Sequence, residues 1–333
     1  MNPARNRVPL MLFKQIDALV CGEGFASQET ADRTRAYQAA LRSDEPLCLT
    51  IAASLLAIPD ARVSLFTGFV VPGRYPAGEN DGPLGAAALA RALKRVGLRP
   101  TIHVDPEILE TMRWLLAELG ADVCVTPIDH TTPVSLDATD VAIAIEKPGA
   151  NAEGVLHTFD GSRIEGGSKP IDRLFADLDR AGTLTIGIGD RGNEIGFGLL
   201  HDALRKLSPK TQTCTCGCDG GVAAVTTTRH LYPAAVSNWG AYGLTAALAL
   251  LVENPTIVLR PEEEQRMLLV AAVRGCCDGV RRRGVFGVDG LAGDVSVRLV
   301  GALHDVVTKF PTASHTSAPV RDPIESENEA LRG

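Results

Sequence analysis

The sequence predicts an α/β fold, a doubly wound, mostly parallel sheet with helices on both faces and an N-terminal helical elaboration. Three observations lead to this prediction. Short apolar runs alternate with segments of helical periodicity, which is typical of strands joined by crossover helices. Some runs, such as VAIAI at 141–145, are apolar at every position, as in strands buried on both faces. A composition of 45% hydrophobic and 22% charged residues is ordinary for a globular protein.

The sequence predicts helices first and then strands that alternate with helices. Residues 15–60 interleave charged and apolar positions and predict a helical N-terminal part. The apolar run 63–69 (VSLFTGF) predicts a strand, and 85–96 (GAAALARALKRV) predicts a helix that stops at Gly97. The next expected elements are a strand at 100–104, a helix at 106–119 with proline at its first position, and a strand at 122–125.

The alternation continues toward the C-terminus. Residues 141–145 predict a buried strand, and 155–164 a hairpin about Asp160-Gly161. The further expected strands are 183–188 and 221–227, and the further expected helices are 171–181, 195–207, 239–253, 261–277 and 293–307. We expect a single domain over residues 1–310. Residues 311–333, rich in Ser, Thr, Pro and Glu, are expected to be a disordered tail.

Charge and hydropathy exclude several classes of partner. The 33 basic and 40 acidic residues give a formal net charge of −7, which argues against a nucleic-acid backbone or an anionic membrane. No apolar run reaches the roughly 20 residues that span a bilayer, and residues 1–14 lack a secretory signal pattern. We therefore expect a cytoplasmic protein without nucleic-acid or membrane partners, with a homo-oligomer left open.

Eight cysteines in such a chain indicate reduced thiols. The run Cys214-Thr-Cys216-Gly-Cys218 is the exception, because three closely spaced thiols can bind a soft metal. Zinc sites commonly use a spacing of about two to four residues between cysteines and a second, distant pair. Cys276-Cys277 is a poor second pair, because neighbours on a helix point about 100° apart. The spacing therefore favours a surface loop or a strand edge over a metal site.

Ligands of an open α/β sheet bind beyond the carboxyl ends of its strands, and polar loops follow several of the expected strands. In the first loop, Thr67 stands at a strand tip, and Glu79 and Asp81 come just before a helix. Two carboxylates at that spacing can share a cation or a substrate ammonium group. The alternative is a surface loop with capping acids, and the residues alone do not separate the two.

The second loop begins with Glu146, directly after the apolar run 141–145. An acid at this place is either a ligand-facing group or a solvated residue at the strand exit, and the residues alone favour the latter. The third loop, 187–198, contains Asp190, Asn193 and Glu194 among glycines that let backbone approach a ligand. Asp190 is suited to hold a hard metal or an amine.

The third loop also matches G-x-G-x-x-G at Gly187, Gly189 and Gly192. This strand lies late in the chain, and no acidic residue ends a following strand about 20 residues on, as a dinucleotide site would require. A phosphate-binding P-loop and a G-x-S-x-G nucleophile elbow are absent from the sequence. We therefore expect no nucleotide cofactor.

A fourth polar segment spans 226–242. His230 could carry a proton near neutral pH, although a single histidine is more often structural. Ser237 and Asn238 are expected to be the N-cap of the long helix that follows. The same helix start would offer backbone amides to a carboxylate ligand.

Together, these segments resemble the D-glutamate cyclase-like C-terminal domain family over about residues 15–308. Five stretches carry the resemblance in the same order along the chain, at 67–69, 79–93, 144–149, 187–198 and 236–242. Three positions depart from the family's usual pattern. Asn80, Arg191 and Arg229 stand where the family usually has threonine, glycine and an acid, respectively.

The resemblance implies a hydro-lyase that cyclises D-glutamate to 5-oxo-D-proline with loss of water. We assign a divalent metal, Mn²⁺ or Mg²⁺, to Glu79, Asp81 and Asp190. Acid/base roles are assigned to Glu146, Glu194 and His230. Substrate contacts are assigned to Thr67, Asn193, Ser237 and Asn238. The alternatives are a non-catalytic module that binds an amino acid or a nucleotide and, less favoured, a dinucleotide-dependent oxidoreductase.

Overall fold

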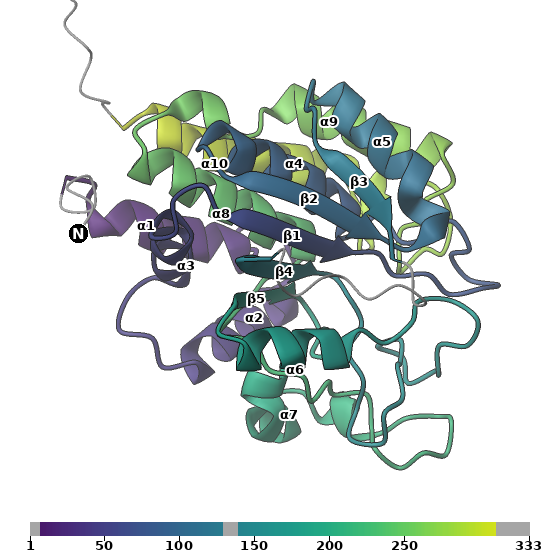
Figure 1. Cartoon of the computed structure of the whole chain (residues 1–333). Coiled ribbons are helices and arrows are strands. Elements are labelled where there is room, and N and C mark those ends of the chain that lie inside the picture. Colours follow the sequence, from purple (N-terminus) through teal and green to yellow (C-terminus); the bar gives the residue numbers. More distant parts are fainter. Residues whose placement is uncertain (1–6, 129–138, 311–333) are drawn as a thin grey trace, which may run out of the picture.

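Six parallel strands form the central sheet of the computed structural model, which describes residues 7–128 and 139–310. The strand order is β3-β2-β1-β4-β5-β6 (Figure 1). The strands are β1 (Arg62–Thr67), β2 (Arg99–Val104), β3 (Cys124–Pro127), β4 (Val141–Ile145), β5 (Leu184–Gly189) and β6 (His230–Pro233). A short antiparallel pair, β7 (Gly287–Val288) and β8 (Leu291–Ala292), lies outside this sheet. The expected tail at 311–333 lies outside the described residues.

Helices cover both faces of the sheet, which confirms the predicted fold class (Figure 1). One face carries α4 (Pro83–Arg95) and α8 (Ser237–Leu251). Around these two pack α1 (Leu10–Val20), α3 (Leu47–Leu56), α5 (Leu109–Glu118), α9 (Pro261–Val273) and α10 (Gly293–Thr308). The helices of the other face are α2 (Gln28–Ala40), α6 (Asp172–Arg180) and α7 (His201–Leu207). The predicted helical N-terminal part is therefore α1 to α3.

Alternating side chains explain how one strand serves both layers. Val63 and Leu65 of β1 belong to the large core with α4 and α8, whereas Phe66 points to the other face. There Phe66 packs against Phe175 of α6, with ring centroids 5.5 Å apart. Helix α8 is buried along its whole length, as expected for a helix that is apolar on all sides.

The chain order reverses between β1 and β4, which are neighbours in the sheet although β2 and β3 separate them in sequence. In a sheet of this kind the loops on either side of the reversal diverge and leave a crevice at the carboxyl ends of the strands. Thr67 ends β1 and Glu146 follows β4, so both stand at this crevice. The topology thus predicts a ligand site there before any side chain is considered.

Two predicted elements differ from the structure. Residues 221–227 are not a strand, because their amides bond to other loops; Val225 N donates to Ala150 O and Ala224 N to Gly192 O. The sixth strand is instead β6, which starts at His230 and pairs with β5. The helix expected at 195–207 becomes a short 3-10 turn followed by α7. The hairpin expected at 155–164 is present, with His157 and Arg163 bridged as antiparallel partners.

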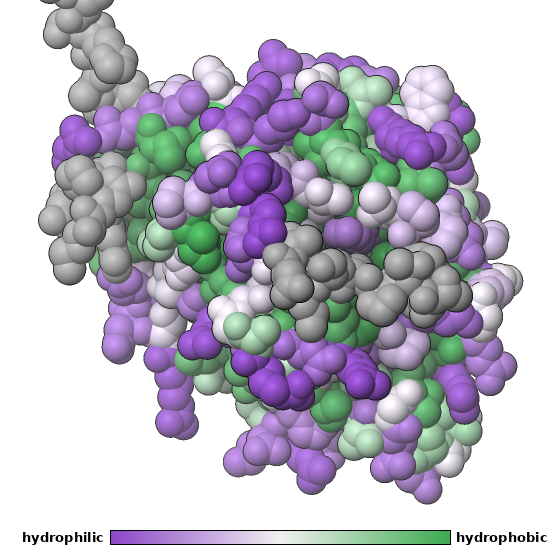
Figure 2. Space-filling view, in the orientation of Figure 1, coloured by the Kyte–Doolittle hydropathy of each residue, from purple (hydrophilic) through white to green (hydrophobic). Residues whose placement is uncertain are grey.

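Hydrophilic side chains cover most of the face shown in Figure 2, and the hydrophobic areas between them are small. Scattered exposed apolar residues of this kind are normal on a folded protein. Within 7–128 and 139–310, no helix has the length and apolarity needed to cross a bilayer.

Candidate active site

A pocket of about 210 Å³ opens at the crevice between the ends of β1 and β4. Its wall combines acidic, basic and aromatic side chains from segments far apart in sequence. The lining residues used below are Glu79, Glu146, Asp160, Arg191, Asn193 and Asp289, together with Arg74, Phe159 and Arg282. Its volume is below the range of about 300–1,000 Å³ typical of drug-sized ligands, which suits a small, charged molecule.

Three carboxylates gather at the ends of β4 and β5, and we call Glu146, Asp190 and Glu194 the carboxylate cluster. One oxygen of each lies within 4.8 Å of the others, and all three residues are buried. The loop amides hold Glu194, which accepts hydrogen bonds from Arg191 N at 3.1 Å and Gly192 N at 2.8 Å. Glu146 accepts a hydrogen bond from the hydroxyl of Ser237. Residues predicted from two separate loops therefore meet in one cluster.

Two glycines of the loop 187–198 allow parts of the backbone to pack closely against each other. A Cβ on Gly187 would lie 2.5 Å from the carbonyl oxygen of Ile195, and one on Gly189 would lie 2.9 Å from Cβ of Glu194. Side chains at these positions would push the loop off its own strand. The two glycines thus let the loop fold back and place Glu194 beside Glu146. That they also let backbone approach a ligand stays a prediction.

Asp81 and Asn238 cap each other's helices. Asp81 accepts hydrogen bonds from Ser237 N at 3.0 Å and Asn238 N at 2.7 Å, at the start of α8. Asn238 Oδ1 in turn accepts from Gly82 N at 2.9 Å and Gly85 N at 2.7 Å, at the start of α4. The prediction that Ser237 and Asn238 cap their own helix is wrong, because a carboxylate from a distant loop takes that place. The amides expected for a substrate carboxylate are bonded to Asp81.

Burial governs the protonation of the acidic groups. It raises the pKa of Asp190 to about 7, with Arg191 opposing the shift and Glu194 adding to it. Burial, followed by the charges of Asp190 and Glu194, raises the pKa of Glu146 well above its ordinary value. Burial and the charge of Asp81 do the same for Glu79. At neutral pH this pocket therefore contains carboxylic acids that can donate protons.

Asp289 is a pocket residue that sequence reasoning missed. It stands in the turn between β7 and β8 with φ of +46°, in the left-handed region. Its Oδ2 accepts a hydrogen bond from Arg191 at 2.6 Å, and Arg191 also bonds to Asp190 at 3.1 Å. Burial and the charge of Asp190 raise the pKa of Asp289 to about 7. No local pattern marks this residue, since the chain's fold alone brings the turn to the crevice.

The other predicted residues lie in different surroundings. Glu79 and Asn193 line the pocket, and Asn193 Oδ1 is buried without a partner among the residues that the structure describes. Thr67 is buried under Gly82, where a Cβ would lie 2.6 Å from its Oγ1. These three assignments stay predictions.

The structure does not bring His230 to this pocket. It begins β6, whereas the carboxylate cluster lies at the carboxyl ends of the strands. Its Nε2 lies 3.2 Å from the Ser54 hydroxyl, in a groove lined by Arg229 and residues of the N-terminal helices. The acid/base assignment rested on the ordinary pKa of histidine and on the family resemblance, and neither of these fixes the end of the strand at which the residue stands.

Comparisons with known proteins cover most of the chain. The model of a family described as D-glutamate cyclase-like, C-terminal, matches residues 28–304, a range that includes every pocket residue named above. The human protein D-glutamate cyclase, mitochondrial, is 29% identical over 221 residues. That stretch is 59% of this chain and 34% of the human protein, so the chain spans about a third of that relative's length.

Proposed function

The chain belongs to the D-glutamate cyclase-like C-terminal family, and from that premise we propose that it cyclises D-glutamate to 5-oxo-D-proline. In this reaction the α-nitrogen forms a bond to the γ-carbon, and one γ-oxygen leaves as water. The human relative carries the name of the activity, but the similarity covers only 34% of it. The assignment to this chain therefore depends on the chemistry of the pocket.

The observation that carries the proposal is the buried carboxylate cluster at the crevice. The substrate ammonium must lose one proton before its nitrogen can attack and a second as the amide forms, and the departing γ-carboxylate oxygen must gain two protons to leave as water. Glu146, which lines the pocket and whose pKa is raised well above its ordinary value, is suited to donate one of these protons to the oxygen. Asp289 also lines the pocket, and its pKa of about 7 suits it to accept the ammonium proton. One pocket thus holds both an acid and a base.

Polar groups of the wall suit the rest of the substrate. Arg74 and Arg282 share Asp160 at 2.7 and 2.9 Å, and guanidinium groups bind carboxylates through paired hydrogen bonds. The unpartnered Oδ1 of Asn193 can accept a hydrogen bond from the substrate ammonium. Leaving such a buried acceptor unsatisfied costs about 1–3 kcal/mol, which favours a ligand that donates to it.

Proximity lowers the barrier further. The amine and the γ-carboxyl belong to one molecule, so a pocket that folds the substrate into a ring removes much of the entropic cost of bringing them together. For this reason the reaction does not strictly demand ATP.

The carboxylate cluster also fits a hard divalent cation, because all its donors are oxygens and each carboxylate has more than one lone pair. Mn²⁺ or Mg²⁺ would be held by Glu146, Asp190 and Glu194 in their ionised form, rather than by the set predicted from sequence, so the acid role of Glu146 applies to the metal-free pocket. When bound, the cation would polarise a carboxyl group of the substrate. Asp81 is not part of that group, and its oxygens accept from the α8 amides.

The test is direct. The purified chain is incubated with D-glutamate, with and without Mn²⁺ or Mg²⁺, and 5-oxoproline is measured by mass spectrometry. Ring opening of 5-oxo-D-proline is followed too, because an enzyme accelerates both directions. L-Glutamate serves as the matched control for chirality. Binding of D-glutamate without turnover would favour a non-catalytic module, and stabilisation by NAD would favour an oxidoreductase.

Two further predictions, the cellular location and the oligomeric state, each need their own experiment. The human relative is named as mitochondrial, so the expected cytoplasmic location is best tested by imaging the tagged chain in cells. The homo-oligomer is tested by light scattering of the purified protein.

A further inference from the structure

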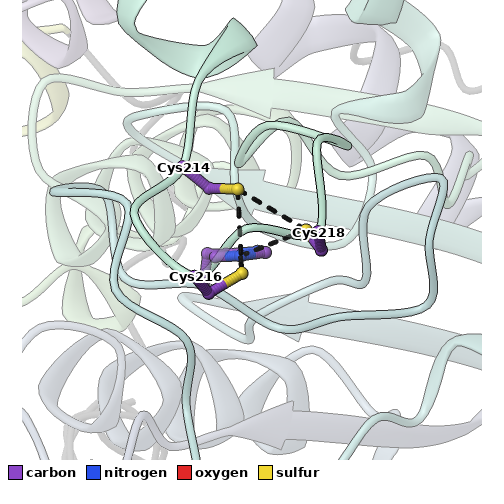
Figure 3. A group of neighbouring side chains, drawn as sticks. Cys214, Cys216 and Cys218 are labelled. Atoms are coloured by element: carbon purple, nitrogen blue, oxygen red, sulfur yellow. Dashed lines mark hydrogen bonds between the residues drawn. The ribbon is translucent and has the colours of Figure 1, made fainter.

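A second group of metal-ligating side chains lies apart from the carboxylate cluster. Cys214, Cys216 and Cys218 converge with His157, and one donor atom of each lies within 4.8 Å of the others. Figure 3 shows the three thiols pointing toward one another. The Sγ atoms of Cys214 and Cys218 are 3.5 Å apart, and those of Cys214 and Cys216 are 3.7 Å apart. Nε2 of His157 lies 3.1 Å from Cys216 Sγ and 3.8 Å from Cys218 Sγ.

These separations match a tetrahedral zinc site. At the usual Zn–S distance of about 2.3 Å and Zn–N distance of about 2.0–2.1 Å, tetrahedral ligands lie about 3.8 Å apart for two sulfurs. The corresponding sulfur–nitrogen separation is about 3.5 Å. A disulfide would instead need two sulfurs about 2.05 Å apart. The four side chains are thus arranged around a common centre rather than as a bonded pair.

The surroundings of His157 suit a metal ligand. Nδ1 of His157 lies 3.2 Å from the carbonyl oxygen of Val155, so a proton on Nδ1 leaves the lone pair of Nε2 toward the thiols. Such a backbone partner is the usual arrangement behind a metal-binding histidine. Asn151 Nδ2 donates to Cys218 Sγ at 3.3 Å, a contact that stabilises a thiolate.

Two loops supply these ligands and are tied together by their backbones. Thr215 N donates to Gly161 O at 2.9 Å, which docks the cysteine loop on the 155–164 hairpin. Between the last two cysteines Gly217 has φ of +77°, which permits the tight turn that brings their sulfurs together. His157 thus supplies the fourth ligand. From the sequence, the second pair of ligands considered was Cys276-Cys277, which is poorly suited to the role.

We propose that Cys214, Cys216, Cys218 and His157 form a structural zinc site, here called the zinc cluster. Three sulfurs and one imidazole nitrogen are a soft donor set that favours Zn²⁺ over Mg²⁺ or Mn²⁺. All four positions are filled by the protein, so no open position is left for a substrate, and the metal's role is to hold the two loops.

The zinc cluster lies behind one wall of the pocket, where His157 contacts Asn193. The carbonyl oxygen of His157 accepts a hydrogen bond from Asn193 Nδ2 at 3.1 Å, and the next residues of the hairpin, 158–160, line the pocket. Zinc would therefore fix the position of Asn193 and Asp160 from behind. This consequence for catalysis depends on the proposed function, whereas the metal site does not.

Metal content tests the proposal without any activity assay. Full-length chain purified under reducing conditions in zinc-supplemented buffer, then freed of loose metal by gel filtration, is analysed by inductively coupled plasma mass spectrometry. We expect about one zinc per chain. Replacement by Co²⁺ should give an intense thiolate-to-cobalt charge-transfer band and the visible absorption of tetrahedral cobalt. Less than a tenth of an equivalent of zinc, together with no charge-transfer band, would overturn the proposal.

Variants locate the metal. Cys216→Ser and His157→Gln should each lower the retained zinc at least tenfold, whereas Cys124→Ser, which removes an exposed thiol on β3, should retain it. Glu194→Gln in the carboxylate cluster should also retain zinc. Full zinc in both ligand variants would contradict the site, as would a Cys214–Cys218 disulfide that persists in wild-type protein purified under reducing conditions. The cobalt spectrum of the wild type decides the matter even if a ligand variant fails to fold.

Discussion

The carboxylate cluster and the zinc cluster are both groups of candidate metal ligands, yet they differ in chemistry and surroundings. The first is built from oxygen donors, is buried and stands at the ends of strands in the central sheet. The second is built from sulfur and nitrogen, is partly exposed and lies on two loops. In the proposed mechanism the acid, Glu146, thus stands at the end of a strand of the central sheet, while a closed metal site stabilises loops that complete the pocket.

Removing the acid of the carboxylate cluster should have the largest effect. Glu146→Gln keeps the shape and the hydrogen bond to Ser237 but cannot donate the proton to the departing oxygen. We expect kcat to fall about 10²- to 10⁴-fold, with zinc content unchanged. The matched control, Glu107→Gln, removes an exposed acid and should keep full activity. Equal activity of Glu146→Gln and wild type would remove Glu146 from the reaction.

Removing a zinc ligand should affect catalysis less. Cys216→Ser leaves every reacting group in place but frees the hairpin that positions Asn193. We expect kcat/KM to fall by up to about 100-fold, mostly through KM, because a misplaced positioning group costs about that much. Steady-state kinetics on the folded variant checks this. A fall in kcat as large as that of Glu146→Gln would contradict the division of roles between the clusters.

The reciprocal caps should contribute to stability near the carboxylate cluster. Asp81→Ala removes the acceptor of two buried amides at the start of α8 and should lower the free energy of unfolding by about 2 kcal/mol. Ser27→Ala, which removes an exposed cap that accepts from Thr30 N, is the comparison and should cost about 1 kcal/mol or less. Urea unfolding of both variants measures the difference. An equal cost would mean that Asp81 is an ordinary surface cap.

The stability contributed by two buried aspartates should fall as pH rises from about 4 to 7. The folded-state pKa of Asp190 and Asp289 is about 7, above the ordinary carboxyl value, so these two carboxyl groups bind more protons in the folded chain than in the unfolded chain across that window. Their contribution to the free energy of unfolding therefore decreases as pH rises from about 4 to 7 and levels off above it. Asp289→Asn should flatten part of this slope in urea titrations without added Mg²⁺ or Mn²⁺. An unchanged slope would indicate that Asp289 is not protonated in the fold.

The smallest expected effect is at His230. His230→Ala changes a side chain at the amino end of β6, beside Ser54 rather than the pocket. We expect kcat/KM and its pH dependence to stay within about twofold of wild type, measured on D-glutamate. A fall in kcat/KM of more than tenfold would indicate that His230 takes part in the reaction.

Sequence reasoning found the elements whose signal is local. Apolar runs such as 141–145 predict the strands, and the rule that ligands bind at strand ends marks the loops that carry Glu146 and Asp190. The residues alone favoured a solvated Glu146, and that interpretation is wrong because the structure buries this side chain. Strand β6 was misplaced because its four residues, HLYP, have a weaker apolar pattern than the loop at 221–227 before them. Burial of that loop, rather than strand pairing, explains its apolar residues.

Contacts between segments that are distant in sequence could not be predicted from the sequence alone. Asp81 and Asn238 each resemble a local cap, and only the packing of α4 on α8 shows that they exchange roles. Asp289 and His157 have no motif of their own, since their partners lie about a hundred and about sixty residues away in sequence, respectively. The spacing of the cysteines therefore looked unsuited to zinc until the hairpin supplied a fourth ligand.

One measurement tests the central claim that the buried carboxyl groups promote cyclisation. D-Glutamate labelled with ¹⁸O at both γ-carboxyl oxygens is incubated with zinc-loaded wild type and with Glu146→Gln, and the product is weighed by mass spectrometry. The wild type should form 5-oxoproline that retains one labelled oxygen, with the other released as water, while the variant forms at least a hundredfold less. A folded, zinc-loaded wild type that forms no labelled 5-oxoproline, with or without Mn²⁺ or Mg²⁺, would contradict it.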